Sequence, residues 1–185
     1  MLKEISARAE REMKKAIEAT VKGFNGVRTG RASLALLDGL MVEAYGSPVP
    51  VNQVANLAVP ETRLMTLQPW DPSLLPAIEK AILKSDLGVT PTNDGKLIRI
   101  PIPALTEERR RELVKVVRKI AEEGRVAVRS VRRDANESLK RKEREKEASE
   151  DEVKKGQDTI QGLTNRLIKE IDELLAKKEK EIMEF

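Results

Sequence analysis

The N-terminal segment carries apolar residues at steps of three and four, the spacing that places side chains along one stripe of a helix. This pattern predicts a helix over residues 2–28, which would be about 40 Å long at helical rise. The stripe consists of Leu2, Ile5, Ala9, Met13, Ala16, Ile17, Val21, Phe24 and Val27. A helix with a single apolar stripe needs other elements to cover it, so we expect partners elsewhere in the chain.

Two further helices are predicted in the C-terminal half. One begins after Thr106, a plausible N-cap, with Glu107 and Glu108 in the first turn, where carboxylates favour the positive helix end. Its apolar stripe is Leu113, Val117, Ile120, Gly124, Ala127, Val131 and Ala135, and the charged run 140–147 leaves its end open. The other begins at Ser149, because Glu152 follows at the spacing of a capping box. Its stripe is Val153, Ile160, Leu163, Leu167, Ile171, Leu174 and Ile182.

Three amphipathic helices can bury their stripes only against one another, and the regular spacing favours a slender bundle with small crossing angles. Residues 31–105 separate the first helix from the other two, so we predict that they form an insertion. Proline supports this division, because all nine prolines lie between Pro48 and Pro103 and proline is excluded from helix interiors. Two short connections would join the domains, and they could act as a hinge.

The inserted segment is predicted to be a small α+β domain. Strands are expected over residues 40–45, 54–59, 63–67 and 97–102, with turn residues between them. Asp71, Pro72 and Ser73 begin a helix that ends near Gly88. Tyr45 and Trp70 are predicted to be core residues, because a small domain with few aromatic side chains needs them inside.

Composition narrows the possible chemistry. The 185 residues include no His and no Cys, which removes imidazole bases, thiolate nucleophiles and Cys/His zinc sites. We therefore expect a protein that is not an enzyme and holds no metal or cofactor.

No apolar run approaches the roughly 18 residues of a membrane span, and charges stand where a signal peptide would be apolar. We expect a cytoplasmic protein that has no contact with membranes.

Charge is concentrated in the predicted bundle. Residues 31–105 contain six Lys and Arg against seven Asp and Glu, whereas the rest of the chain contains 29 against 24. On the wheel of the second helix, with Leu113 at zero and about 100° per residue, five arginines share one strip with no acid among them. The strip is about 32 Å long at helical rise. It consists of Arg111, Arg118, Arg125, Arg129 and Arg132, with Arg133 and Lys115 beside it.

An arginine strip suits phosphate oxygens, because the planar guanidinium can donate two parallel hydrogen bonds. We predict a structured RNA as the partner rather than DNA, since a rigid rod can follow RNA phosphates and 2′-hydroxyls without reading bases. Only four aromatic residues are available to stack on a single strand. The alternative interpretation is an ordinary solvated helix face.

A second basic cluster, Arg28 and Arg31, lies where the first helix is predicted to end. Gly30 is expected to adopt the left-handed conformation that closes a helix, with Arg28 beside the negative helix end. Both arginines could also contact RNA.

Four segments resemble the bacterial ribosome recycling factor family: residues 28–32, 85–88, 105–110 and 125–134. The similarity extends over essentially the whole chain, including the Glu184-Phe185 ending. The resemblance implies an α+β, two-domain, L-shaped protein, with an elongated antiparallel three-helix bundle (residues 1–30 and 105–185) and an inserted β/α/β domain (31–104). The implied hinge consists of Thr29, Gly30, Arg31, Pro103, Ala104, Leu105 and Thr106.

The resemblance also implies a function in ribosome recycling after translation termination. The family binds the large ribosomal subunit across the aminoacyl and peptidyl tRNA sites. With elongation factor G and GTP it splits the post-termination ribosome. The positions that match its ribosomal RNA contacts are Arg28, Arg31, Arg129, Arg132 and Arg133, whereas Arg111, Arg118 and Arg125 are added by helical periodicity alone. We expect a monomer in solution.

The sequence departs from the family pattern at three positions. Ala44 precedes Tyr45 where two aromatic residues are frequent, Thr90 stands where Asn is usual, and Ser130 replaces an Asn between the arginines. The last change could alter one polar contact with RNA.

Two other functions stay open at this point. One is a helical adaptor that binds an acidic protein partner, and the other is a carboxylate-dependent hydrolase. Steep salt dependence and loss of binding after ribonuclease treatment would indicate RNA, whereas nucleotide turnover by the chain alone would indicate the hydrolase.

Overall fold

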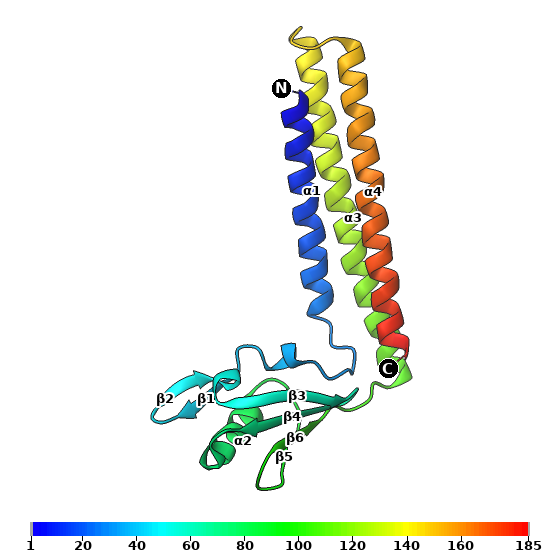
Figure 1. The fold of residues 1–185 in the computed structure, drawn as a ribbon. Coiled ribbons are helices and arrows are strands. Elements are labelled where there is room, and N and C mark those ends of the chain that lie inside the picture. Colours follow the sequence, from blue (N-terminus) through cyan, green and yellow to red (C-terminus); the bar gives the residue numbers. More distant parts are fainter. Residues whose placement is uncertain (1, 185) are drawn as a thin grey trace. The chain divides into compact units, whose positions relative to one another are not determined.

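The computed structural model describes residues 2–184, which form two compact units. Met1 and Phe185 lie outside the described residues. Phe185 is one of the two residues at the end of the chain that resemble the family. One unit contains the described residues up to Thr29 together with Glu107–Glu184, and the other is Gly30–Thr106. Helices make up the first unit, whereas the second contains the strands and one further α-helix (Figure 1). The predicted α+β class with an inserted small domain is confirmed.

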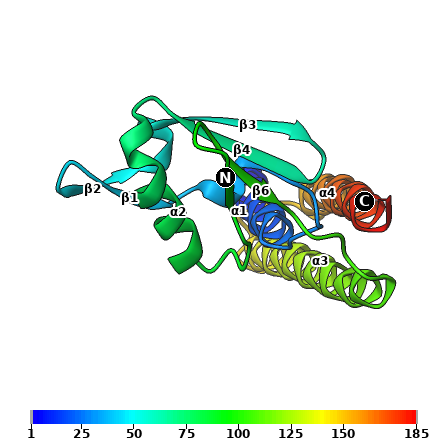
Figure 2. The same ribbon diagram turned by 90° about the horizontal axis from the view of Figure 1, so that it is seen from below.

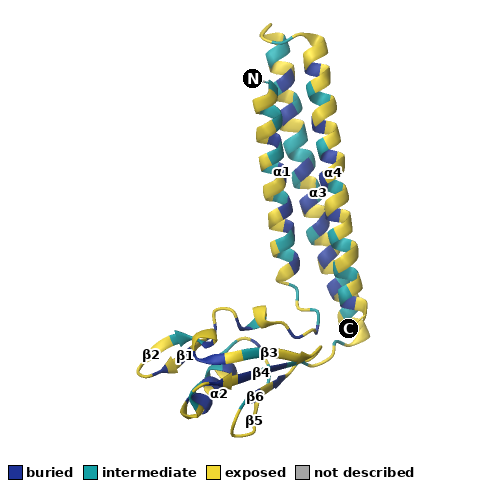
Figure 3. Cartoon of the chain, viewed as in Figure 1, coloured by how far each residue is buried: buried dark blue, intermediate teal, exposed yellow. Residues whose placement is uncertain are grey.

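Three long helices form the first unit over the described residues: α1 (Leu2–Asn25), α3 (Glu107–Arg144) and α4 (Glu150–Glu184). Figure 2 views them nearly end-on, with each helix packed against the other two. Figure 3 colours the helices by burial, and buried positions recur among exposed ones along each helix. The largest fully buried side chains of this unit are Met13, Leu139, Ile160, Ile171 and Ile182.

The helix boundaries follow local signals. The α4 capping box is present, because the Ser149 Oγ accepts a hydrogen bond from the Glu152 N–H at 3.2 Å and the Ser149 N–H donates to Glu152 Oε2 at 2.8 Å. The α3 helix begins at Glu107, directly after Thr106, as predicted. The prediction for α1 is too long by three residues, because the helix ends at Asn25. Gly30 does have a positive φ of 73°, but it lies five residues beyond that end and does not close the helix.

The second unit is built on a four-stranded antiparallel sheet with strand order β3-β4-β6-β5. Its strands are β3 (Ala55–Glu61), β4 (Leu64–Pro69), β5 (Thr92–Asn93) and β6 (Ile98–Pro101). A separate hairpin consists of β1 (Met41–Ala44) and β2 (Ser47–Pro50). The helix α2 (Leu75–Lys84) follows β4, and short 3-10 turns cover Leu34–Leu37, Val51–Gln53 and Pro72–Leu74.

One apolar core holds this unit together. Alternate residues of β4 and β6 are buried, among them Met65, Leu67, Ile98 and Ile100. Ile78 of α2 belongs to the same buried cluster. Two elements were not predicted, β2 and β5. The β2 strand contains Pro48 and Pro50, and because proline cannot donate to a ladder it fits only at an edge.

Candidate nucleic-acid interface

The five arginines of the predicted strip all lie on α3, but the strip does not face open solvent along its whole length. The buried residues of α3 include Ala121 and Val128, which lie on the arginine side of the predicted apolar stripe. As a result Arg118 and Arg125 border the seam between α3 and α4. Arg125 is the clearest case, since its side chain is only 19% exposed.

Two of these arginines connect α3 to α4. The Arg118 Nε lies 2.6 Å from Glu179 Oε1, and the Arg125 Nε lies 2.8 Å from Asp172 Oδ1. Glu179 raises the pKa of the Arg118 guanidinium. Burial opposes the charge of Arg125, but the hydrogen bonds that its guanidinium donates to Asp172 and Glu122 outweigh it and raise the pKa of that guanidinium too. Both side chains therefore serve as cross-links within the bundle.

Two more arginines of the strip pair with acids of their own helix. Arg129 Nη1 is 3.4 Å from Glu122 Oε1, and the other oxygen of Glu122 lies 3.0 Å from Arg125 Nη1. Arg111 pairs with Glu107 one turn before it. The prediction of a strip free of acids is therefore wrong. A helical wheel of α3 alone does not show the acids of α4. It also does not show that a long, flexible arginine side chain can reach an acid outside the strip on the same helix.

Arg132 and Arg133 differ from the other arginines of α3 considered so far. Within residues 2–184 neither side chain has a hydrogen bond or an ion pair. Arg132 is half-buried and Arg133 is exposed. Their guanidinium groups keep all their donors for an external partner, and phosphate oxygens match that donor geometry.

The remaining predicted contacts lie elsewhere in the chain. Arg28 belongs to the helical unit and Arg31 to the inserted unit, and both are exposed. Each already makes an interaction within the protein. The bundle therefore brings together Arg125, Arg129 and Glu122, whereas Arg132 of the strip and Arg133 beside it are unpaired within residues 2–184.

Two aromatic residues of the inserted unit are exposed, which contradicts the prediction that they lie in the core. Tyr45 is 78% exposed and Trp70 is 67% exposed. The Tyr45 hydroxyl donates a hydrogen bond to Asp71 Oδ2 at 2.6 Å, which raises the pKa of the tyrosine and lowers that of the carboxyl. The core is aliphatic instead, because Met, Leu and Ile side chains from β4, β6 and α2 already fill it. No signal in the sequence separates these two rings from core residues.

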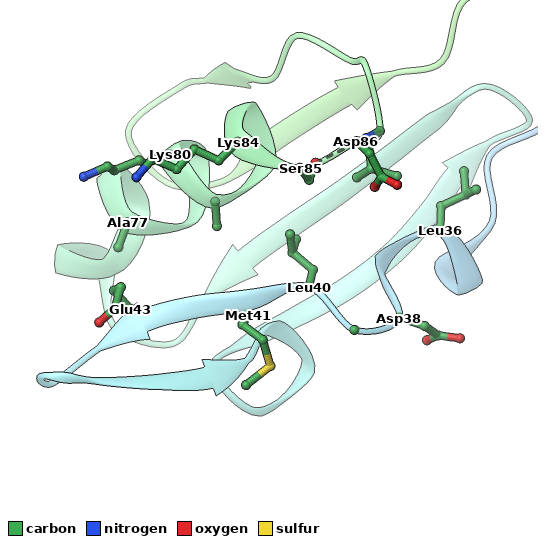
Figure 4. Close-up of a pocket in the computed structure, with 13 residues that line it drawn as sticks. Leu36, Asp38, Leu40, Met41, Glu43, Ala77, Lys80, Lys84, Ser85 and Asp86 are labelled. Carbon is green, nitrogen blue, oxygen red and sulfur yellow. Dashed lines mark hydrogen bonds between the residues drawn. The ribbon is translucent and has the colours of Figure 1, made fainter.

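The inserted unit also contains a hollow of about 630 Å³ between α2 and the segment around β1. Figure 4 shows Lys80 and Lys84 on the helix side, with Asp38 and Glu43 among the residues on the other side. Because charges of both signs line it, the hollow lacks the single-signed surface that binds a polyanion.

Within residues 2–184, none of the helices combines the length and the apolar character that crossing a bilayer requires.

Comparisons with known proteins identify the family. The family model described as "Ribosome recycling factor" matches residues 20–183. The ribosome-recycling factor of Desulfatibacillum aliphaticivorans is 54% identical over 185 residues, and that of Syntrophomonas wolfei is 59% identical over 184 residues. Both alignments cover 100% of this chain and 100% of the relative.

Solved structures agree with the sequence matches. A solution structure of a ribosome recycling factor has a TM-score of 0.77 and 47% identity, covering 100% of this chain and 98% of the other. The T. thermophilus ribosome recycling factor, in models with E. coli elongation factor G on the E. coli post-termination complex, has a TM-score of 0.64 and 48% identity. That match covers 99% of each chain. The chain belongs to the ribosome recycling factor family.

Proposed function

We propose that this chain promotes the recycling of ribosomes after translation termination. In this proposal the helical bundle binds ribosomal RNA of the large subunit across the aminoacyl and peptidyl tRNA sites. Elongation factor G and GTP then drive separation of the subunits. Family membership supports the proposal, as does the T. thermophilus relative described with elongation factor G on a post-termination complex. Because the GTPase supplies the energy, the chain itself needs no catalytic group.

The proposed anchor on RNA is the Arg132 guanidinium, with Arg133 beside it. The observation that carries this assignment is the absence of an intramolecular partner for either side chain in the described part of the chain. A free guanidinium can form charge-assisted hydrogen bonds with phosphate without first leaving a carboxylate. Arg118 and Arg125 would have to break bonds to Glu179 and Asp172 before they could do the same. We therefore assign them a smaller share of the binding.

The two connections between the units are proposed as the hinge. They comprise Thr29, Gly30 and Arg31 on one side and Pro103, Ala104, Leu105 and Thr106 on the other. Gly30 supports this assignment, because its φ of 73° suits a residue without a Cβ, and a Cβ there would lie 3.0 Å from Leu105 Cγ.

The anchor can be tested with Arg132→Ala, using Arg118→Ala as the matched control. Both changes remove one arginine from α3, but Arg118 is already paired with Glu179. Binding to isolated large ribosomal subunits would be measured over a range of salt concentrations. A charge-assisted hydrogen bond contributes about 1.5–3 kcal/mol, so Arg132→Ala should weaken binding by about 10- to 100-fold. Its slope of log K against log salt should fall by about one unit.

Arg118→Ala should reduce binding much less. If Arg132→Ala binds large subunits as tightly as the parent does, the anchor assignment is wrong. A ribonuclease arm tests the adaptor alternative, because binding that survives digestion and high salt would indicate an acidic protein partner. Splitting of post-termination ribosomes with and without elongation factor G then tests the complete function.

A further inference from the structure

The two ion pairs between α3 and α4 form successive rungs of a ladder. Arg118 pairs with Glu179 and Arg125 pairs with Asp172. The arginines are seven residues apart along α3, and the acids are seven residues apart in the opposite direction along α4. Seven residues are close to two helical turns, so each step returns to the same side of its helix.

The same antiparallel register continues past the second rung. A Cβ on Gly124 would lie 3.3 Å from Ile171 Cδ1, and a Cβ on Gly156 would lie 3.1 Å from Leu139 Cδ1. Gly124 and Leu139 are separated by the same number of residues on α3 as Ile171 and Gly156 are on α4, in the opposite chain direction. The pairing of the two helices is therefore unchanged across the stretch of α3 that carries Arg132.

One more step of seven along α3 reaches Arg132, and the matching step along α4 reaches Asn165. This position holds a neutral amide where the first two rungs hold carboxylates. Its Oδ1 accepts a hydrogen bond from Gln161 Nε2 at 2.8 Å. The neighbouring cation Arg166 points to another helix, since its Nη2 lies 3.1 Å from Glu10 Oε1 of α1.

The whole segment of α4 around this position lacks acids. Residues 159–169 contain no Asp or Glu, although α4 is rich in acids before and after them. By the register of the ladder this segment lies opposite the part of α3 that contains Arg129, Arg132 and Arg133. Arg129 pairs with Glu122 of α3 itself, whereas Arg132 and Arg133 are unpaired in the described part of the chain.

We propose that Asn165 is the positioning residue that keeps the Arg132 guanidinium available for RNA. This inference rests on the proposed function. A carboxylate at position 165 would complete a third rung, and phosphate would then have to displace it. The side chain of Asp is long enough for this geometry, because Asp172 reaches Arg125 at 2.7 Å in the rung before.

Asn165→Asp tests the inference without altering any residue proposed to touch RNA. The change preserves size, and a carboxylate oxygen can still accept the hydrogen bond from Gln161. An exposed ion pair contributes up to about 1 kcal/mol, which corresponds to about fivefold in binding. We expect Asn165→Asp to weaken binding to large ribosomal subunits by about two- to fivefold while the melting temperature stays equal or rises. The salt slope should fall toward that of Arg132→Ala.

Two controls separate capture of Arg132 from general repulsion of RNA. Thr159→Asp adds the same charge to α4 about 120° away around the helix, and it should bind more tightly than Asn165→Asp. In the Arg132→Ala background, Asn165→Asp should have no further effect on binding.

The outcomes distinguish this inference from the proposed function. If Arg132→Ala binds as the parent does, the RNA anchor itself fails, and Asn165 has no arginine to protect. If Arg132→Ala weakens binding but Asn165→Asp does not, the role of Asn165 is overturned. An equal loss from Asn165→Asp with and without Arg132 would also overturn it, because the effect would then be simple charge repulsion.

Discussion

Gly124 of α3 lies against side chains of both α1 and α4, and replacing it with Ala should destabilise the protein. An added Cβ would clash with Thr20 Oγ1 of α1 and would lie 3.3 Å from Ile171 Cδ1 of α4. Thr20 cannot move aside easily, because it is 3% exposed and its hydroxyl donates to the Ala16 carbonyl at 2.9 Å. Its β-branched side chain is also stiff at χ1.

The expected magnitude follows from three contributions. Overpacking a close contact costs about 1–3 kcal/mol. Displacing the Thr20 hydroxyl from its hydrogen bond costs about 1 kcal/mol more. The Gly-to-Ala change itself gains about 1 kcal/mol in a helix interior. The net free energy of unfolding should therefore fall by about 1–3 kcal/mol.

Gly162→Ala in α4 is the matched control. Gly162 is exposed, and a Cβ there would meet no atom within 4 Å. Only the helix-propensity gain remains, so this change should stabilise the bundle by about 1 kcal/mol. The same substitution is thus expected to have opposite signs at two positions of one bundle.

Urea unfolding followed by far-UV circular dichroism would measure both variants, because the bundle provides most of the helical signal. The single tryptophan, Trp70, lies in the other unit, and its fluorescence reports whether that unit is unaffected. Each kcal/mol should shift the melting temperature by about 2–4 °C. Thr20→Ala in the Gly124→Ala background should recover stability, because it removes the hydroxyl in the way. If Gly124→Ala is as stabilising as Gly162→Ala, the packing argument is refuted.

Two further predictions concern local signals. Ser149→Ala should lower the free energy of unfolding by about 1 kcal/mol, because it removes the capping hydrogen bond at the start of α4, and the urea midpoint would report this. Hydrogen bonds from the Leu97 and Lys96 backbone and from Arg99 lower the pKa of Asp94 from 3.8 to about 2. Because the pKa of Asp94 is lower in the folded state, its carboxylate stabilises the folded state above pH 3.8, and this stabilisation is lost as the pH falls toward 2. Asp94→Asn should therefore make the melting temperature of the inserted unit less pH-dependent between pH 2 and 3.8. An unchanged pH dependence would show that the hydrogen bonds to Asp94 do not stabilise this unit.

Local patterns were sufficient to predict most of the fold. The long helices have regular apolar spacing, and α4 begins at the capping box that Ser149 and Glu152 indicate. The strands β1, β3, β4 and β6 were predicted from short apolar runs between turn residues. The β2 and β5 strands escaped prediction, because each depends on pairing with another strand more than on its own residues.

Exposure of single side chains was harder to predict. Tyr45 and Trp70 were expected inside because aromatic rings usually fill a core, yet both are exposed. Whether a ring is needed inside depends on how completely other side chains fill the space. Here Met65, Leu67 and Ile78 belong to an aliphatic cluster assembled from β4 and α2.

The sequence by itself determined the three amphipathic helices, the insertion marked by proline and the concentration of arginine on α3. Each of these depends on residues within a few turns of one another. Only the tertiary structure decided which arginines are paired. The partners of Arg125 and Arg118 lie 47 and 61 residues away in the chain and reach them only because α3 and α4 pack antiparallel in one register. The same register places a neutral residue opposite Arg132, so the availability of that charge is a property of the folded bundle.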